Sequence, residues 1–568
     1  KTAVDATSPG GATAIGEGLL AGHNEVTAAP TSFSMQDVLI LLSDGMENVS
    51  PYYNTPSVKG VIEPTDTIIH TVAVGPPSAG HHDLLDTIAS DNGGESYHIN
   101  VDTTTTALLG RTAVSAGEGL DAWPLTLPNR IGDAYKQIAE EILGENRLFQ
   151  AFNLADPKTG QHNYNLTVPE GLSRLTFALN WEFDTDLLRL TLVDPKGTTF
   201  AHDPQKPAEF CRGDTSHETC IIPSPEPGDW KITVQFLEGS NLNEYVVWAS
   251  ARTAVQFKLA VGTPVHQRIA GEPIHLLAFL NQEGKPLEAR VSVRVYPPGS
   301  ESLFGLDLHD DGQHGDGHKG DGIYAASFVA VRGGGPYAVR GGATGQDALG
   351  NPFTLYDNLN FHVKPRVLYV YNYNLETARE VESLLEGHSL AVDLAFKGSV
   401  PFLDLDPYSL VIIGPDTGYT GTWTPQAAIN AITQKEIPVF GLGEGGYAYF
   451  GKRSSAIGYP NGAHGSGASI LANHNTTSDQ IWQYPYWLLN LSKEEWMLYN
   501  QNSSLVQIYL PQPVAGVDIF GFNPTNLNYA NIVMENNWYL LWGFGDGPSK
   551  MNDEGKQLFV NTAHRLIK

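Results

Sequence analysis

Residues 38–42 form an unbroken run of apolar side chains, and the chain turns polar directly after them, at Ser43, Asp44 and Gly45. A run of this kind predicts a strand that is buried on both faces, as the strands of parallel sheets are. Ligands of open α/β sheets bind beyond the carboxyl ends of the strands, so the Asp44 carboxylate is a candidate ligand group. The simpler interpretation is that Asp44 only caps the helix that follows.

Apolar and polar segments alternate on both sides of this strand. They predict a glycine-rich turn that opens an amphipathic helix, a second buried strand, a helix and a short strand, at residues 10–19, 67–75, 84–89 and 93–99. Strands that alternate with helices are typical of α/β domains with parallel sheets. We therefore expect an α/β unit over residues 1–115.

The motifs GGATAIGEGL, LLSDG and VAVG, in this order and spacing, resemble the second half of a von Willebrand factor A domain. In that family a Thr and an Asp at the positions of Thr13 and Asp44 help to hold Mg²⁺ at a metal-ion-dependent adhesion site. Hydroxyl, carboxylate and water oxygens suit this hard cation, and an open coordination position then accepts a carboxylate of a protein partner. The resemblance implies cation-dependent protein binding through Thr13 and Asp44.

One part of the family's pattern is missing from the sequence. The family's first metal motif, Asp-x-Ser-x-Ser, follows the first strand of its sheet, whereas this chain begins at Lys1, just before the second motif. A half sheet with an open central edge would be prone to aggregate. We therefore expect an N-terminal segment, either cleaved or not included in the sequence, to complete the A domain.

The periodicity changes after residues 131–143, whose apolar positions have helical spacing. Residues 116–150 are expected to hold this helix and a linker. Short alternating strands separated by regular turns then predict β-sandwiches. The expected bounds are residues 151–255 for the first sandwich and residues 256–364 for the second, which is of the fibronectin-III or Ig type.

The second sandwich contains an acidic, glycine-rich loop within residues 308–324. Carboxylates so close in sequence repel one another unless a cation lies among them, and glycines allow the loop to wrap around that cation. The sequence therefore predicts Ca²⁺ binding, with a solvated acidic turn as the alternative. A hard ion is favoured over the transition metal that the histidines of the loop would suit. The predicted ligands are Asp310, Asp311, Asp316 and Asp321.

The order of these features over residues 1–364 resembles the calcium-activated chloride channel regulator family. The features are the helix followed by NRLFQ, the DPKG sandwich with its PGDW turn, and the DDG…GD…GDGIY loop. The resemblance implies an A domain, a β-sandwich and a fibronectin-III-like domain in series, as in secreted or surface-attached regulators and adhesive modules. That family's metalloprotease domain lies upstream of the A domain, and this sequence has no HExxH motif.

From residue 365 to residue 568 the pattern returns to alternating strands and helices, with apolar runs at 366–371, 410–413 and 438–442. This part resembles the flavodoxin-like class I glutamine amidotransferases, whose nucleophilic Cys lies in the turn after the third strand. Gly443 stands at that position, so the thiolate needed for covalent acyl chemistry is absent. Glu444 beside it is either a general base or a structural carboxylate, and we expect an inactive domain.

The composition narrows the possibilities further. A chain of 568 residues is too long for one core, and about 150 residues per domain suggests about four domains. The net charge of −28 argues against nucleic acid, whose binding relies on cationic contacts to phosphate. No apolar run approaches the about 20 residues of a membrane span. Cys211 and Cys220 share one loop and predict a local disulfide, with two free thiols as the alternative.

Together these patterns predict a multidomain α/β plus all-β protein located outside the cell or at its surface. We expect a non-enzymatic adhesion or assembly protein that uses Mg²⁺ and Ca²⁺ and binds a protein partner or a neighbouring subunit. One alternative is a structural surface-layer or filament subunit, which the acidic, glycine-rich composition also permits. The other is a hydrolase whose active site lies in the C-terminal domain around Glu444 and His464.

Overall fold

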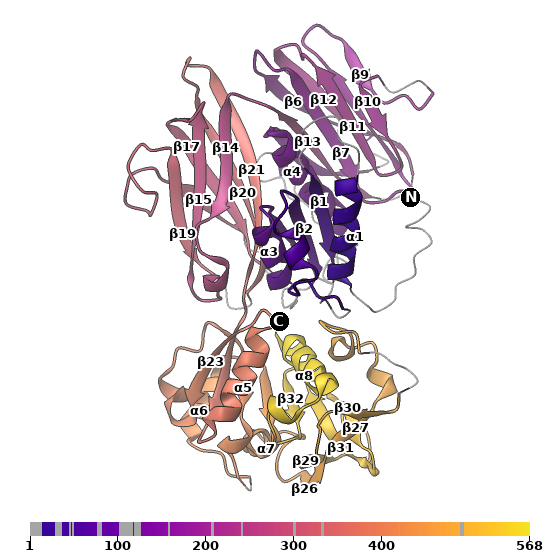
Figure 1. Cartoon of the computed structure of the whole chain (residues 1–568), viewed down its shortest axis with the longest axis vertical. Helices are drawn as coiled ribbons and strands as arrows, with labels where there is room; N and C mark the ends of the chain where they lie inside the picture. Colours follow the sequence, from indigo (N-terminus) through magenta and orange to yellow (C-terminus); the bar gives the residue numbers. More distant parts are fainter. Residues whose placement is uncertain are drawn as a thin grey trace.

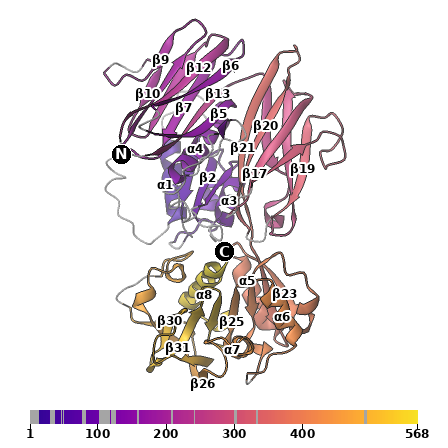
Figure 2. The same ribbon diagram turned by 180° about the vertical axis from the view of Figure 1, so that it is seen from behind.

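The structure is a computed structural model of the chain. Figures 1 and 2 show an upper body, in which an α/β unit packs against two β-sandwiches, and a lower α/β body formed by the C-terminal part. The described residues are 14–28, 37–44, 47, 50–75, 82–100, 117–118, 126–156, 160–205, 209–239, 242–298, 303–330, 334–419, 421–488 and 493–567.

The α/β unit near the N-terminus is built on a three-stranded parallel sheet in the order β1-β2-β3. Apolar side chains of its helices pack on β2, and Ile15, Leu19, Ile69, Ala73 and Leu85 belong to one buried cluster. The elements are α1 (Ile15–Ala28), β1 (Val38–Ser43), α2 (Lys59–Ile62), β2 (Ile68–Gly75), α3 (His82–Asp91) and β3 (Ser96–Asn100).

The strand predicted at residues 38–42 is confirmed as β1, but its burial differs from the expectation. Ile40 is 40% exposed and Leu42 is 45% exposed. The reason is the position of the strand: β1 pairs with β2 on one side, and no other described strand pairs with it. A strand with the sequence of a fully buried one therefore forms the edge of the described sheet.

The helix predicted at residues 131–143 is α4 (Leu127–Leu143), and it leads straight into a sandwich strand. Gly144 has a φ of 61°, the left-handed conformation that ends helices, and it turns the chain into β5 (Asn146–Ala155). The first sandwich thus begins inside the segment that the sequence suggested was a linker. A short strand, β4 (Gly117–Glu118), pairs with β5.

The first sandwich packs a sheet of order β10-β11-β7-β13-β5 against a sheet of order β6-β12-β8-β9. Its strands alternate as predicted; β8, for example, alternates between buried and half-buried side chains. The remaining strands are β6 (Gln161–Val168), β7 (Arg174–Trp181), β8 (Leu187–Val193), β9 (Thr199–Ala201), β10 (Cys211–Gly213), β11 (His217–Pro223), β12 (Gly228–Glu238) and β13 (Asn243–Ala251).

The second sandwich is joined to the first through a continuous sheet, because β5 and β21 pair at Arg147 and Tyr356. Buried side chains of both sandwiches belong to one hydrophobic cluster. The two predicted sandwiches therefore form a single packed body. The strands are β14 (Val255–Val261), β15 (Pro273–Gln282), β16 (Lys285–Pro286), β17 (Ala289–Tyr296), β18 (Phe304–Leu308), β19 (Ile323–Val329), β20 (Gly335–Gln346) and β21 (Pro352–Val363).

A buried ionic network holds α4 to both sandwiches. The Asp133 carboxylate on α4 accepts hydrogen bonds from Arg147 on β5 (2.8 Å) and from Arg340 on β20 (2.7 Å). Arg147 also donates to Glu140 (2.9 Å), and both guanidinium groups donate to Gln150. All five side chains are buried. Burial alone would raise the pKa of Asp133, but the two guanidinium groups hold it below its usual value.

The C-terminal domain has three layers. Its parallel strands lie in the order β23-β22-β24-β25-β32, with α5 and α8 packed on one face and α6 and α7 on the other. Arg366 at its start pairs with Glu272 of the second sandwich at 2.9 Å. The elements are β22 (Arg366–Tyr371), α5 (Leu375–Glu386), β23 (Ala391–Phe396), β24 (Tyr408–Ile413), α6 (Gln426–Gln434), β25 (Val439–Leu442), α7 (Gly443–Lys452), β32 (Tyr539–Trp542) and α8 (Asp553–Leu566).

An antiparallel extension completes this sheet beyond β32. It brings β26 and β29 together as neighbours, at the side where α7 begins. Its strands are β26 (Gly462–Gly467), β27 (Ser469–Ala472), β28 (Glu495–Met497), β29 (Ser503–Tyr509), β30 (Val517–Asn523) and β31 (Asn526–Glu535).

We predict that Asp133→Asn destabilises the upper body strongly. The change keeps the shape of the side chain but leaves two buried guanidinium groups without their shared carboxylate. Loss of one partner of a buried ion pair costs about 3–5 kcal/mol. Thermal unfolding should show a clearly lower Tm for this variant. Glu226→Gln, which breaks the solvent-exposed pair with Lys196, is the matched control and should leave the Tm unchanged. Equal Tm values for the two variants would contradict the role given to the network.

Candidate functional site

Asp44 lies where the sequence places it, directly after β1, and its side chain is exposed. Thr13, the other predicted Mg²⁺ ligand, falls outside the described residues. Burial and then the charge of Asp44 raise the pKa of Tyr484, which belongs to the C-terminal domain. An exposed carboxylate at this end of a parallel strand is available to a ligand.

Glu47, three residues after Asp44, connects the start of α1 with the backbone at Tyr53. Its carboxylate accepts hydrogen bonds from the backbone N–H of Gly16 (2.7 Å), at the start of α1, and from that of Tyr53 (2.9 Å). Burial raises the pKa of Glu47, and these backbone hydrogen bonds counteract the rise. Sequence reasoning did not identify Glu47, although its position three residues after Asp44 was a usable signal.

The acidic loop of the second sandwich is organised by its own backbone. Asp310 accepts from the N–H groups of Gly320 (2.5 Å) and Gly322 (2.9 Å), and Asp321 accepts from that of His318 (3.0 Å). The imidazole of His314 hydrogen-bonds Asp311 at 3.0 Å, and this bond is the main cause that lowers the pKa of Asp311. Each of these three carboxylates therefore has a hydrogen-bond partner within the loop itself.

Asp316 is the one member of this acidic loop that is fully buried, with an exposed fraction of 1%. Its Oδ2 accepts from Gly312 N at 2.7 Å, whereas its Oδ1 has no hydrogen-bond partner among the described atoms. Within the described part of the chain, no three His, Cys, Asp or Glu side chains form a group that could hold a metal ion. The Ca²⁺ site at these residues stays a prediction.

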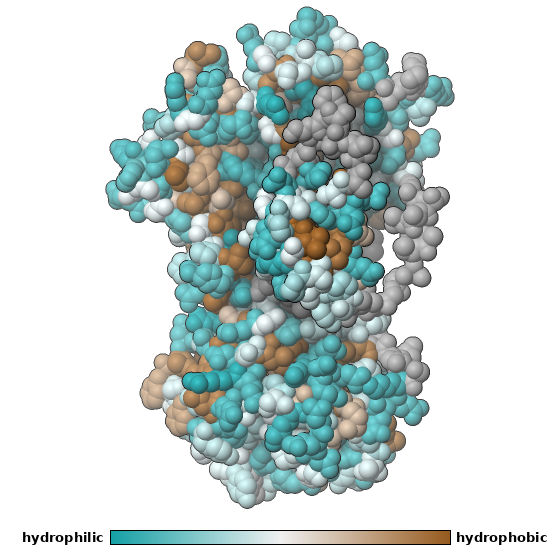
Figure 3. Space-filling model, viewed as in Figure 1, coloured by the Kyte–Doolittle hydropathy of each residue, from teal (hydrophilic) through white to brown (hydrophobic). Residues whose placement is uncertain are grey.

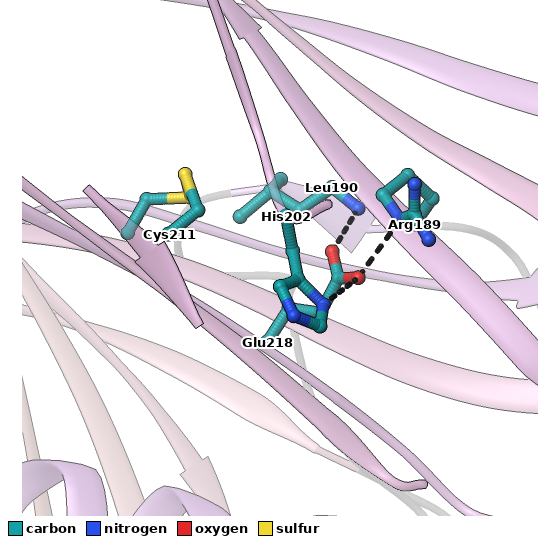
Figure 4. The surroundings of a disulfide bond; sticks show 6 residues. Arg189, Leu190, His202, Cys211 and Glu218 are labelled. Carbon is teal, nitrogen blue, oxygen red and sulfur yellow. Dashed lines mark hydrogen bonds and ion pairs between the residues drawn. A yellow bond between two sulfur atoms is a disulfide. The ribbon is translucent and has the colours of Figure 1, made fainter. Parts of the chain in front are cut away.

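The disulfide predicted between Cys211 and Cys220 is confirmed. The two residues face each other on the neighbouring strands β10 and β11, and both are buried. Figure 4 shows Glu218 beside the disulfide, where its carboxylate accepts from Leu190 N (2.6 Å) and Arg189 Nε (2.9 Å). Burial raises the pKa of Glu218. These contacts fix the sandwich around the disulfide.

The C-terminal domain brings Glu444 and His464 together, as the hydrolase alternative requires. Glu444 Oε2 and His464 Nε2 are 2.6 Å apart, with His464 60% and Glu444 20% exposed. Glu444 lies in the first turn of α7, which starts directly after the parallel strand β25. A carboxylate bonded to an imidazole fixes the orientation of the ring.

Gly443, at the turn before Glu444, leaves no room for a nucleophilic side chain. Its φ is 47°, a left-handed value that favours glycine. A Cβ built there would lie 2.9 Å from the Cα of Gly545 and 3.2 Å from the Cβ of Pro415. Cys at this position would thus require a shift of the backbone at Gly545. The degenerate amidotransferase interpretation of this turn stays a prediction.

Ser504 is the hydroxyl that sequence reasoning missed near this pair. Strands β26 and β29 align His464 with Val506 and Ser466 with Ser504, so the side chains of these residues project from the same face. Ser504 is exposed, and its Oγ lies 2.4 Å from where a Cβ of Gly545 would be. Only the tertiary pairing shows this proximity, because residue 504 is far from residues 444 and 464 in sequence.

One protein family matches part of the chain. Residues 262–356 match the family described as the conditioned medium factor second Ig-like domain. The match lies inside the second sandwich and supports its Ig-like character. Comparison with curated proteins gives no match. In the described residues, no helix is both long enough and apolar enough to cross a membrane.

Solved structures share only weak similarity with the chain. A DUF4785 family protein of Legionella pneumophila has 9% identity and a TM-score of 0.28, with 44% of this chain and 63% of that chain covered. The lipase BlEst2 of Bacillus licheniformis in propeptide form has 15% identity and a TM-score of 0.22, with 54% and 65% covered. A GMP synthase protein of Thermoplasma acidophilum has 9% identity and a TM-score of 0.23, with 35% and 93% covered. The chain thus spans less than two thirds of the first two structures, and none of the three supports an argument about function.

If the acidic loop binds Ca²⁺, the ion should raise the Tm of the protein by about 3 °C in millimolar CaCl₂ relative to EDTA. Asp316→Asn should abolish this rise, because the amide keeps an acceptor for Gly312 N but removes the buried charge. Asp307→Asn, at an exposed position on the preceding strand, should keep the rise. An unchanged Tm of the wild-type protein in Ca²⁺ and in EDTA would contradict the prediction.

Proposed function

We propose that this protein is a non-enzymatic adhesion or assembly protein, located outside the cell or at its surface, which binds a polypeptide partner through the α/β unit. The observation that supports this most is the edge strand β1, which combines exposed Ile40 and Leu42 with an exposed carboxylate, Asp44, at its carboxyl end. An apolar edge strand offers unpaired backbone groups to another strand. The disulfide and the Ig-like domain are compatible with an extracellular location.

The surface of the α/β unit fits this proposal. Figure 3 shows an apolar patch on this unit, surrounded by hydrophilic side chains. Apolar patches rimmed by polar residues are typical of protein interaction sites. In this interpretation the unit is part of a von Willebrand factor A domain, and a strand of a partner, or of a segment outside the described residues, completes its sheet beside β1.

The proposed cation is Mg²⁺, held by Asp44 and Thr13 and by a carboxylate of the partner. The hydrogen bond from Gly16 to Glu47 supports this, because it anchors the start of α1, which follows Thr13, beside the loop that follows Asp44. The net charge of −28 also favours a cation between this protein and an acidic partner. The C-terminal domain, which we interpret as an inactive amidotransferase-like domain, then serves as a binding or packing module.

Asp44→Ala should abolish Mg²⁺-dependent binding with little change in Tm. The measurement is the retention of beads coated with the protein on cells of its source organism, in Mg²⁺ and in EDTA. In Mg²⁺, the retention of Asp44→Ala should be at least tenfold lower than that of the wild type. It should equal the retention that the wild type shows in EDTA. Asp518→Ala, at an exposed position on β30, is the matched control.

The contribution of the β1 edge is tested separately with Ile40→Lys, because a charged side chain blocks strand addition. This variant should lose retention in both buffers. Retention unchanged in both Asp44→Ala and Ile40→Lys would contradict the proposal. Electron microscopy of the native material separates the structural alternative from adhesion, since a surface-layer or filament subunit forms a lattice or a fibre and an adhesin need not.

A second candidate function, hydrolysis, is favoured by the 2.6 Å contact between Glu444 and His464 and by the neighbouring Ser504 hydroxyl. A carboxylate that accepts the Nε2 proton leaves Nδ1 of His464 as the basic nitrogen, which can take a proton from water or from a hydroxyl. Against this candidate, the imidazole is largely solvent-exposed, where electrostatic catalysis is weak.

The non-enzymatic proposal and the hydrolase candidate predict different rates of hydrolysis of a p-nitrophenyl ester. The non-enzymatic proposal expects no hydrolysis above the buffer rate. Hydrolysis that Glu444→Gln lowers at least 100-fold, and that Glu495→Gln leaves intact, would require the hydrolase assignment. Glu495 is a suitable control because it lies exposed on β28, where it accepts from Ser469.

A further inference from the structure

Three histidines meet where the α/β unit packs against the second sandwich. His82 begins α3, His98 lies on β3, and His362 lies near the end of β21. Their exposed fractions are 0%, 4% and 2%, and that of Asp86 on α3 is 6%. Strand β3 packs against β20 and β21, and Figures 1 and 2 both place α3 beside this sandwich. The histidine cluster is thus buried at the interface between two units that are far apart in sequence.

The contacts in this cluster are short. His82 Nδ1 and His98 Nδ1 are 2.7 Å apart, and His98 Nε2 lies 2.6 Å from Asp86 Oδ1. The ring of His362 stacks on that of His82, with centroids 4.5 Å apart and an angle of 7° between the planes. Two ring nitrogens at hydrogen-bond distance share one proton, so one is the donor and the other the acceptor.

The protonation pattern follows from Asp86. Burial alone would raise the pKa of Asp86, but the neighbouring imidazoles, above all His98, hold it below its usual value, so the carboxylate is ionised. The ionised carboxylate accepts the Nε2 proton of His98, whose Nδ1 then accepts the proton of His82 Nδ1. In this arrangement His98 and His82 each donate one ring proton along the hydrogen-bond chain that ends at Asp86.

The surrounding charges limit how many protons the cluster can take up. Arg268 is near enough to interact with Asp86, so these two groups balance each other's charge. A proton added to the imidazoles therefore adds a positive charge to a buried place that Arg268 already faces. Two imidazolium rings stacked at 4.5 Å would repel each other as well.

Lysine and carboxylate side chains at the same interface give a dependence of stability on pH that is opposite to the one proposed for the histidines. Lys258 on β14 pairs with Glu95 (3.1 Å) and lies 3.8 Å from Glu141. Burial raises the pKa of Glu141 to about 7 and that of Asp357 on β21 to about 6. Because these folded values lie above the unfolded ones, this group stabilises the interface at low pH and loses that contribution as the pH rises through about 6–7.

Among the described residues, His70 on β2 is a further histidine near this interface, and its Nδ1 accepts from Glu95 N. Burial lowers the pKa of His70. A lowered pKa means that the contribution of His70 to stability is present at neutral pH and falls as the pH drops. The acid response of the interface is therefore carried by imidazoles, and the carboxylates oppose it.

We propose that the histidine cluster of His82, His98 and His362 is a pH-sensitive latch that holds the α/β unit against the second sandwich at neutral pH and releases it near pH 5. When the interface opens, each imidazole reaches water and binds a proton with an ordinary pKa of about 6.5. Each extra proton bound by the open form shifts the opening equilibrium tenfold per pH unit in this range. Release would free the unit that carries the β1 edge from one of its two neighbours.

The test is amide hydrogen exchange of the full chain at pH 7.5 and pH 5.0, with intrinsic rates corrected for pH. Strand β24, buried in the C-terminal domain, is the internal reference. We expect protection of β3 and β21 to fall at least tenfold relative to β24 at pH 5.0. This fall should be about tenfold smaller in His362→Phe, which keeps a stacked ring but removes one of the three titrating imidazoles. Glu141→Gln should retain the tenfold fall, because that carboxylate acts in the opposite direction.

Three outcomes would overturn the proposal. The first is wild-type protection of β3 and β21 that does not change relative to β24 between the two pH values, a result that needs no variant to fold. The second is loss of the acid response in Glu141→Gln, which would assign the titration to the carboxylates. The third is reduced protection in EDTA at pH 7.5, which would make the histidine cluster a metal site. His82→Phe replaces His362→Phe if the latter does not fold.

Discussion

A single buried carboxylate, that of Asp133, determines how the upper body is assembled. It is shared by Arg147 of the first sandwich and Arg340 of the second, so α4, β5 and β20 meet at one point. Charges in such a place require full pairing, and none of the three elements can move without leaving a charge unpaired. The continuous sheet through β5 and β21 and the common hydrophobic cluster join the same two sandwiches.

The ionic junction at Asp133 limits which parts of the upper body can move. Because this network holds the two sandwiches together, the contacts of the upper body that can open or form are those of the α/β unit. The unit presents β1 as an apolar edge on one side and a cluster of imidazoles on the other. In the two proposals made above, the β1 edge binds a partner and the imidazoles respond to pH, so both functions belong to the same small unit.

Much of the local structure could be predicted from the sequence. The apolar run at residues 38–42, the helical spacing at residues 131–143 and the alternation in the sandwiches give the elements that the structure shows, because burial periodicity acts within a few residues. The short separation of Cys211 and Cys220 likewise predicted the disulfide. The exposure of Ile40 and Leu42 was not predictable in this way, since it depends on which strands lie beside β1.

The sequence by itself determined the elements, the lack of a nucleophile at Gly443 and the acidic loop, because each depends on residue type and on neighbours along the chain. Only the tertiary structure decided the sharing of Asp133 by two arginines, the pairing of Glu444 with His464 and the meeting of His82, His98 and His362. These contacts join residues from different elements, in some cases more than 200 positions apart. Their chemistry depends on burial and on distances of a few ångströms, which no local pattern encodes.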